Sequence, residues 1–176
     1  MDVLEKEQLV VYPVVAQEPE IGRWLWMLQD ARQRTLKDLK GLTQQTIDWL
    51  PPDEGSSIGT ILYHIALIEA DWFYVEVLQQ PYPAEVQALL SHTVRNEQEL
   101  LTQVRGFSLA QHLERLGRIR HLLLATYQTM TLEDFRRPRA LPNYDVTPEW
   151  VLHHLMQHEA EHRSQMGSLR IMAEQR

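Results

Sequence analysis

The apolar residues of this chain recur mainly every three or four positions, which is the spacing of one face of an α-helix. The segments with this spacing are residues 21–41, 58–78, 109–130 and 147–173, with a shorter one at 91–104. Glycines and prolines fall mostly between these segments. The pattern therefore predicts a few helices joined by loops rather than many short strands.

The start of the fourth long segment carries the clearest local signal. Thr147 is a preferred N-cap residue, Pro148 suits the first helical position, and Glu149 faces the positive end of the helix dipole. Residues 1–18 lack this periodicity and are predicted to form an irregular leader before a single domain at 19–176. Four long amphipathic helices in one domain predict an all-α four-helix bundle, here with one short extra helix.

Composition narrows the classes of function. The chain has 176 residues, no cysteine, and 24 acidic against 17 basic residues, which gives a formal net charge of -7. The lack of cysteine excludes a disulfide scaffold, an iron–sulfur cluster and a cysteine nucleophile. Nucleic-acid binding needs clustered Lys and Arg, so the acidic balance argues against a nucleic-acid partner. Because no apolar run is long enough for a membrane span and the N-terminus lacks a basic signal-like start, we expect a cytoplasmic protein with no membrane partner.

Two histidines of the fourth helix are the main candidates for chemistry. His158 and His162 are four residues apart, so their rings lie one turn apart on the same side of a helix. That spacing suits two ligands of one metal ion. Both fall on the predicted inward face, which is marked by Val151, Leu155, Met166 and Leu169. Two imidazoles that point into a bundle need a partner, and a metal ion would supply one.

A third histidine, His64, lies on the inward face of the segment 58–78, three residues after Ile61 and four before Ile68. One ligand from this helix and two from the fourth form a three-histidine site with open positions for water or substrate, as in catalytic metal sites. The spacing equally fits a core histidine hydrogen-bonded to a carbonyl group.

The remaining histidines are weaker candidates. His154 precedes His158 by four residues and lies nearer the edge of the inward face, which suits a role in a pocket or beside the metal ligands. The others, expected to be structural or solvated, are His92, His112, His121 and His153.

The segment from His158 to His162 also satisfies H-E-x-x-H, the signature of zinc peptidases in which the glutamate activates water. No further histidine follows His162, and no segment resembles a strand that pairs with an extended peptide, so a peptidase is disfavoured. A ferritin-like di-iron site is disfavoured because the second and third long helices supply no second Glu-x-x-His unit beside Glu159 and His162.

Two stretches resemble the DinB/YfiT-like family of metalloenzymes. The first runs from Thr43 to Trp72 and contains Trp49-Leu50-Pro51-Pro52, Ser57-Ile58-Gly59-Thr60-Ile61-Leu62-Tyr63-His64 and Glu69-Ala70-Asp71-Trp72. The second runs from Thr147 to Met166 and contains the histidine pair. The resemblance covers most of the chain from about residue 20 onward. It implies a four-helix bundle that binds a divalent metal ion, nickel or zinc, through His64, His158 and His162.

The same resemblance implies a function. Relatives include enzymes that use low-molecular-weight thiols such as bacillithiol or mycothiol, and family members often form homodimers. The implied activity is a metal-dependent S-transferase in which a thiol cosubstrate attacks an electrophilic carbon of a small-molecule substrate. Candidates for orienting groups near the site are Glu69, His154 and Glu159. A non-catalytic metal-binding dimer and a metal-dependent hydrolase are the alternatives.

Overall fold

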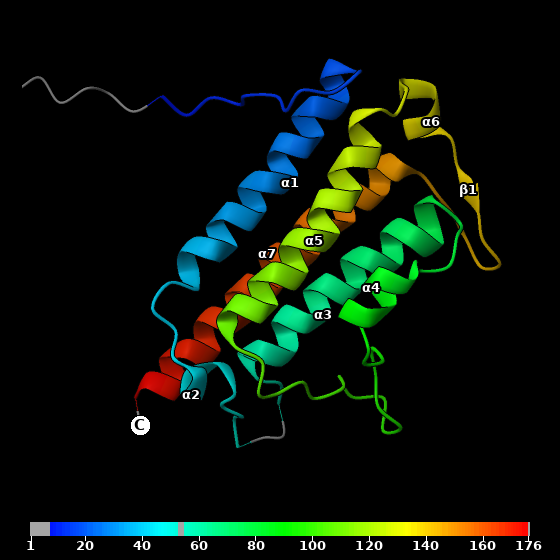
Figure 1. Cartoon of the computed structure of the whole chain (residues 1–176). Coiled ribbons are helices and arrows are strands. Elements are labelled where there is room, and N and C mark those ends of the chain that lie inside the picture. Colours follow the sequence, from blue (N-terminus) through cyan, green and yellow to red (C-terminus); the bar gives the residue numbers. More distant parts are fainter. Residues whose placement is uncertain (1–7, 53–54, 176) are drawn as a thin grey trace, which may run out of the picture.

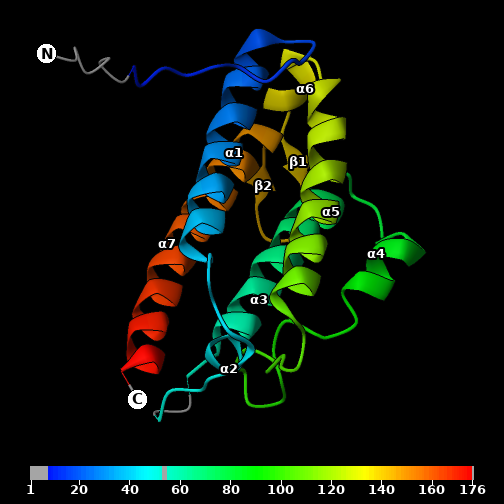
Figure 2. The ribbon, with the colours of Figure 1, turned by 60° about the vertical axis from the view of Figure 1, so that its left-hand side comes forward.

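Four long helices packed side by side form the body of the protein, for which a computed structural model describes residues 8–52 and 55–175 (Figure 1). The long helices are α1 (Pro19–Asp38), α3 (Ile58–Asp71), α5 (Leu109–Gln128) and α7 (Pro148–Glu174). α1 packs mainly against α7 and α3 mainly against α5, and both pairs can be followed in Figure 2. The predicted four-helix bundle is confirmed. Within these described ranges, no helix is long and apolar enough to cross a membrane.

Several short elements connect the long helices. The helices are α2 (Gln44–Ile47), α4 (Ala84–Leu89), α6 (Leu132–Arg136) and a π-helical turn, η1 (Trp72–Val77), which follows α3 directly. The strands β1 (Arg139–Ala140) and β2 (Asp145–Val146) pair antiparallel, with Arg139 opposite Val146. α6 and this hairpin occupy the loop that the sequence predicts between the third and fourth long helices.

The start of α7 follows the predicted capping chemistry. The Thr147 hydroxyl accepts a hydrogen bond from the backbone N–H of Trp150 at 3.1 Å, and Pro148 opens the helix. The residues that mark its predicted inward face, Val151, Leu155, Met166 and Leu169, are all buried. The position of α7, which carries most of the candidate ligands, is thus set by local capping and by the burial of one face.

The predicted helix over residues 91–104 is wrong. This segment is irregular, and the short helix α4 lies before it, at Ala84–Leu89. Asn96 explains part of the difference, because its Oδ1 accepts hydrogen bonds from the backbone N–H groups of Gln98 at 3.0 Å and Leu100 at 3.1 Å. Such side-chain-to-backbone bonds favour a turn over a helix.

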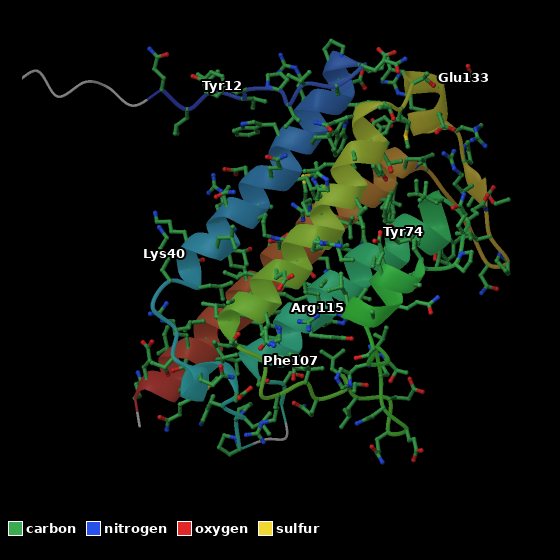
Figure 3. The ribbon with its side chains drawn as sticks, viewed as in Figure 1. Tyr12, Lys40, Tyr74, Phe107, Arg115 and Glu133 are labelled. Carbon is green, nitrogen blue, oxygen red and sulfur yellow. The ribbon has the colours of Figure 1, made fainter. Side chains whose placement is uncertain are left out.

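Arg115 on α5 contacts the chain on both sides of the irregular segment, at Leu89 before it and at Phe107 after it. Its Nε donates a hydrogen bond to the backbone oxygen of Leu89 at 2.9 Å. Its guanidinium carbon lies 4.7 Å from the ring centre of Tyr63 and 4.9 Å from that of Phe107, and Figure 3 shows Arg115 and Phe107 close together at the start of α5. The Tyr63 hydroxyl in turn accepts a hydrogen bond from the His92 backbone N–H at 2.8 Å.

Gly22 lies where the N-terminal segment crosses α1. A Cβ at this position would lie 2.3 Å from the backbone oxygen of Val14, whose N–H donates to the Gly22 oxygen at 3.0 Å. Gly22→Ala is therefore expected to lower the free energy of unfolding by about 1–3 kcal/mol, measured by urea unfolding. Gly117→Ala on α5 is the matched control, since no described atom beyond the neighbouring backbone of its own helix lies within 4 Å of its added Cβ. That control should raise the free energy of unfolding by about 0.5–1 kcal/mol, and similar changes in both variants would contradict the prediction.

Candidate metal centre

Three histidines from two helices converge at one point between α3 and α7. The Nε2 atom of His158 lies 3.1 Å from Nε2 of His64 and 3.1 Å from Nε2 of His162. One ring nitrogen from each of the three lies within 4.8 Å of the others, and each side chain is half-buried. The structure thus brings together all three residues that the sequence and the family resemblance select as metal ligands.

The spacing of these nitrogen atoms fits the coordination sphere of a small divalent metal ion. With metal–nitrogen bonds of about 2.05 Å, neighbouring ligand atoms lie about 3.4 Å apart in a tetrahedron and about 2.9 Å apart in an octahedron. The two 3.1 Å separations fall between these values. Hydrogen bonding alone does not account for both separations, because Nε2 of His158 carries either one proton or one lone pair.

The electrostatic environment keeps two of the rings neutral. Burial, with smaller contributions from the neighbouring His162 and His64, lowers the pKa of His158 to about 3. Burial, with smaller contributions from His162 and Arg95, lowers the pKa of His64 to about 4. Neutral imidazoles offer the lone pairs that metal coordination requires.

Gln165 holds the ring of His162 from the side away from the other histidines. Its Oε1 lies 3.0 Å from Nδ1 of His162, which places the ring proton on Nδ1 and leaves the Nε2 lone pair free. His64 differs, because its Nδ1 is buried and has no hydrogen-bond partner among the described residues. The sequence pattern did not single out Gln165 as part of this centre, although it lies three residues after His162 on the same helix.

Glu69 and Glu159, which the sequence suggests as orienting groups, lie instead in a buried ion-pair network with Arg32 and Arg120. We name these four residues the Arg–Glu cluster. Arg32 contacts Glu69 at 2.8 Å and Glu159 at 2.7 Å, and Arg120 contacts Glu69 at 2.6 Å and Glu159 at 3.0 Å. Glu69 is 2% exposed and Glu159 is 1% exposed. The four members come from α3, α7, α1 and α5, so the cluster ties all four long helices together.

The ion pairs of Glu159 with Arg32 and Arg120 prevent it from acting as a general base. Burial raises its pKa, but the guanidinium groups of Arg32 and Arg120 outweigh burial, so the pKa of Glu159 is lowered. Both of its carboxylate oxygens accept hydrogen bonds from arginine. It is therefore an ionised structural partner rather than a free base, and the water-activating role required by the H-E-x-x-H signature is not available to it.

His154, the third candidate for an orienting group, lies beside the histidine centre in an aromatic cluster. Its ring stacks on Trp150 with ring centres 5.1 Å apart and an interplanar angle of 7°. It also contacts Trp72 at 4.6 Å and lies 5.8 Å from the ring of His158. Burial lowers the pKa of His154, so this half-buried ring is neutral and can both donate and accept a hydrogen bond.

Comparison with known proteins identifies the family of this chain. A search of curated proteins finds no match. The sequence profile of the DinB superfamily matches residues 27–166, a range that contains His64, His158, His162 and most of the helical bundle. This match covers well over half of the 176 residues. The chain therefore belongs to the DinB superfamily.

Proposed function

We propose that this chain is a metal-dependent enzyme that transfers a low-molecular-weight thiol to an electrophilic carbon of a small-molecule substrate. The observation that carries the proposal is the convergence of three Nε2 atoms, with His158 3.1 Å from each of the other two. Among the described residues, the group contains these three histidines and no carboxylate. A three-histidine set leaves coordination positions open to an external ligand.

In the proposed site, the metal ion and the side chains have different roles. A divalent metal ion, nickel or zinc, keeps its positive charge when its ligands are three neutral imidazoles, and it supplies the Lewis acidity that makes a thiol available as thiolate near neutral pH. His64, His158 and His162 provide the neutral donors, and Gln165 orients His162. Because the chain has no cysteine, the sulfur comes from the cosubstrate.

The reaction forms one bond and breaks another at the electrophilic carbon. The sulfur–carbon bond forms, the bond from carbon to the leaving group breaks, and the leaving group departs with its electron pair. The thiol proton passes to solvent. With both glutamates held by arginine, His154 is the remaining polar side chain of the three candidates that can orient the second substrate, through either ring nitrogen.

The test measures thiol binding and thiol transfer separately. Cobalt-loaded protein should develop a near-ultraviolet sulfur-to-cobalt absorption band with 2-mercaptoethanol but not with ethylene glycol, which has oxygen in place of the sulfur. The same protein loaded with nickel or zinc should conjugate bacillithiol, mycothiol or glutathione to 1-chloro-2,4-dinitrobenzene. His162→Ala should abolish both signals, because it removes one of the three donors.

His153→Ala provides the matched control, since His153 is an exposed neighbour on the same helix. It should retain both signals. Conjugation that survives in His162→Ala, or a product formed equally well without any thiol, would contradict the transferase proposal. Stoichiometric metal binding without the sulfur band would favour a non-catalytic metal-binding bundle.

A further inference from the structure

A cleft of about 550 Å³ opens beside the histidine centre, where η1 faces β2 and the start of α7. Its lining residues are Trp72, Tyr144, Asp145, Val146, Thr147 and Trp150. This volume lies within the range of small-molecule binding sites, about 300–1,000 Å³. The cleft is therefore large enough for a substrate group of one or two rings.

Aromatic rings form the walls of this cleft. The Trp72 ring lies 5.3 Å from that of Trp150 and 6.3 Å from that of Tyr144. Trp150 and Tyr144 are each 46% exposed, so part of each ring is open to a ligand. Such exposed aromatic surface, gathered at a cleft, marks a binding site rather than part of the core.

Among the residues that line the cleft, the charge is negative. Asp145 is exposed and lines the cleft, and no Lys or Arg is among the lining residues. The Tyr144 hydroxyl donates a hydrogen bond to Oε1 of Glu76 at 3.0 Å, while Oε2 of Glu76 is buried and has no partner in the described part of the chain. Burial and the negative charges of Glu76 and Asp71 raise the pKa of Tyr144, so its phenol stays neutral. Aromatic faces beside carboxylates attract cations.

A single side chain, His154, lies between the cleft and the histidine centre. His154 contacts both indole rings of the cleft wall, with ring centres 4.6 Å from Trp72 and 5.1 Å from Trp150. On its other side, its ring centre lies 5.8 Å from that of His158. A substrate held in the cleft thus lies one imidazole away from the proposed metal ligands.

We propose that this cleft binds a planar aromatic ring with a positive charge, and that this ring is the part of the substrate that positions it beside the histidine centre. The role of this binding in catalysis rests on the proposed function, whereas the binding itself depends only on the cleft. The ring stacks against Trp150 and Trp72, and its charge faces Asp145 and the Tyr144–Glu76 pair. The chemistry selects against anionic aromatic substrates.

The test compares three ring systems of similar shape and different charge. Metal-free protein is titrated with 1-methylquinolinium, 2-naphthalenemethanol and 2-naphthalenesulfonate, and binding is followed by calorimetry and by the indole N–H signals in a nitrogen–proton NMR spectrum. The cation should bind about tenfold more tightly than the neutral alcohol and more tightly still than the anion. Signals of Trp72 and Trp150 should shift, and those of Trp26 and Trp49 should not.

Three variants separate the cleft from the metal centre. Trp150→Ala should weaken binding of the cation about tenfold, and Asp145→Asn should reduce the preference for the cation over the neutral alcohol several-fold. Trp26→Phe is the matched control on α1, outside the cleft, and should change nothing. His64→Ala should also bind the cation normally, so a failure of the metal centre does not affect this test. No saturable binding, equal affinity for cation and alcohol, or unchanged binding in Trp150→Ala would overturn the proposal.

Discussion

Replacing Arg120 by methionine is expected to lower the free energy of unfolding by about 3–5 kcal/mol. Arg120 contacts Glu69 at 2.6 Å and Glu159 at 3.0 Å in the core, and it also donates to the backbone oxygen of Leu28 at 3.0 Å. Without it, two buried carboxylates share the single guanidinium of Arg32 and one negative charge is left uncompensated. Such a charge is costly because it has lost its hydration. Urea unfolding monitored by circular dichroism measures the change.

Arg118→Met is the matched control for this prediction, because Arg118 lies two residues away on the same helix and is exposed. The control should change the free energy of unfolding by no more than about 0.5 kcal/mol. Combining Arg120→Met with Glu159→Gln restores charge balance, so the double variant should lose less than the sum of the single losses, by about 0.5–3 kcal/mol. Equal effects of Arg118→Met and Arg120→Met, or strict additivity of the double variant, would contradict a coupled cluster.

The Arg–Glu cluster shows what local sequence patterns do not determine. Arg32 is separated from Glu159 by 127 positions and from Glu69 by 37, so no helical spacing relates them. A weaker signal does exist, because Arg32 occupies a position of the apolar seam of α1, four residues after Leu28 and three before Thr35. Arg120 does the same on α5, four residues after Leu116 and three before Leu123. A charge inside an apolar seam predicts a buried partner of opposite charge, but its identity depends on which helices pack together.

More of the histidine centre than of the Arg–Glu cluster could be predicted from the sequence, because two of its members belong to one helix. The spacing of four residues places His158 and His162 on one side of α7 whatever the rest of the fold does. The pairing of α3 with α7, which brings in His64, depends on tertiary packing; the inward face of 58–78 suggested His64, and the family resemblance agreed with that choice. The helix prediction for residues 91–104 was wrong because a local interaction outweighs the apolar spacing. The apolar residues of this segment suggest a helix, but the side chain of Asn96 stabilises a turn.

Replacing His158 by alanine is expected to weaken binding of nickel or zinc by at least about 100-fold, since loss of an outer partner alone weakens metal sites by about 10–100-fold. His158 is the central ligand, because its Nε2 lies 3.1 Å from both of the other Nε2 atoms. In the unsubstituted protein, metal at 100 times its dissociation constant should stabilise the fold by about 2.7 kcal/mol, seen as a rise in melting temperature.

The rise in melting temperature on adding metal distinguishes a histidine that binds metal from one that only supports the structure. His158→Ala should remove the shift while leaving the metal-free melting temperature nearly unchanged, because the ring is half-buried and makes contacts mainly with other histidines. His153→Ala, on the exposed side of α7, should retain the full shift. If His158→Ala instead lowered the metal-free melting temperature and kept the same shift with metal, the ring would serve packing, and the three-histidine centre would have no metal-binding role.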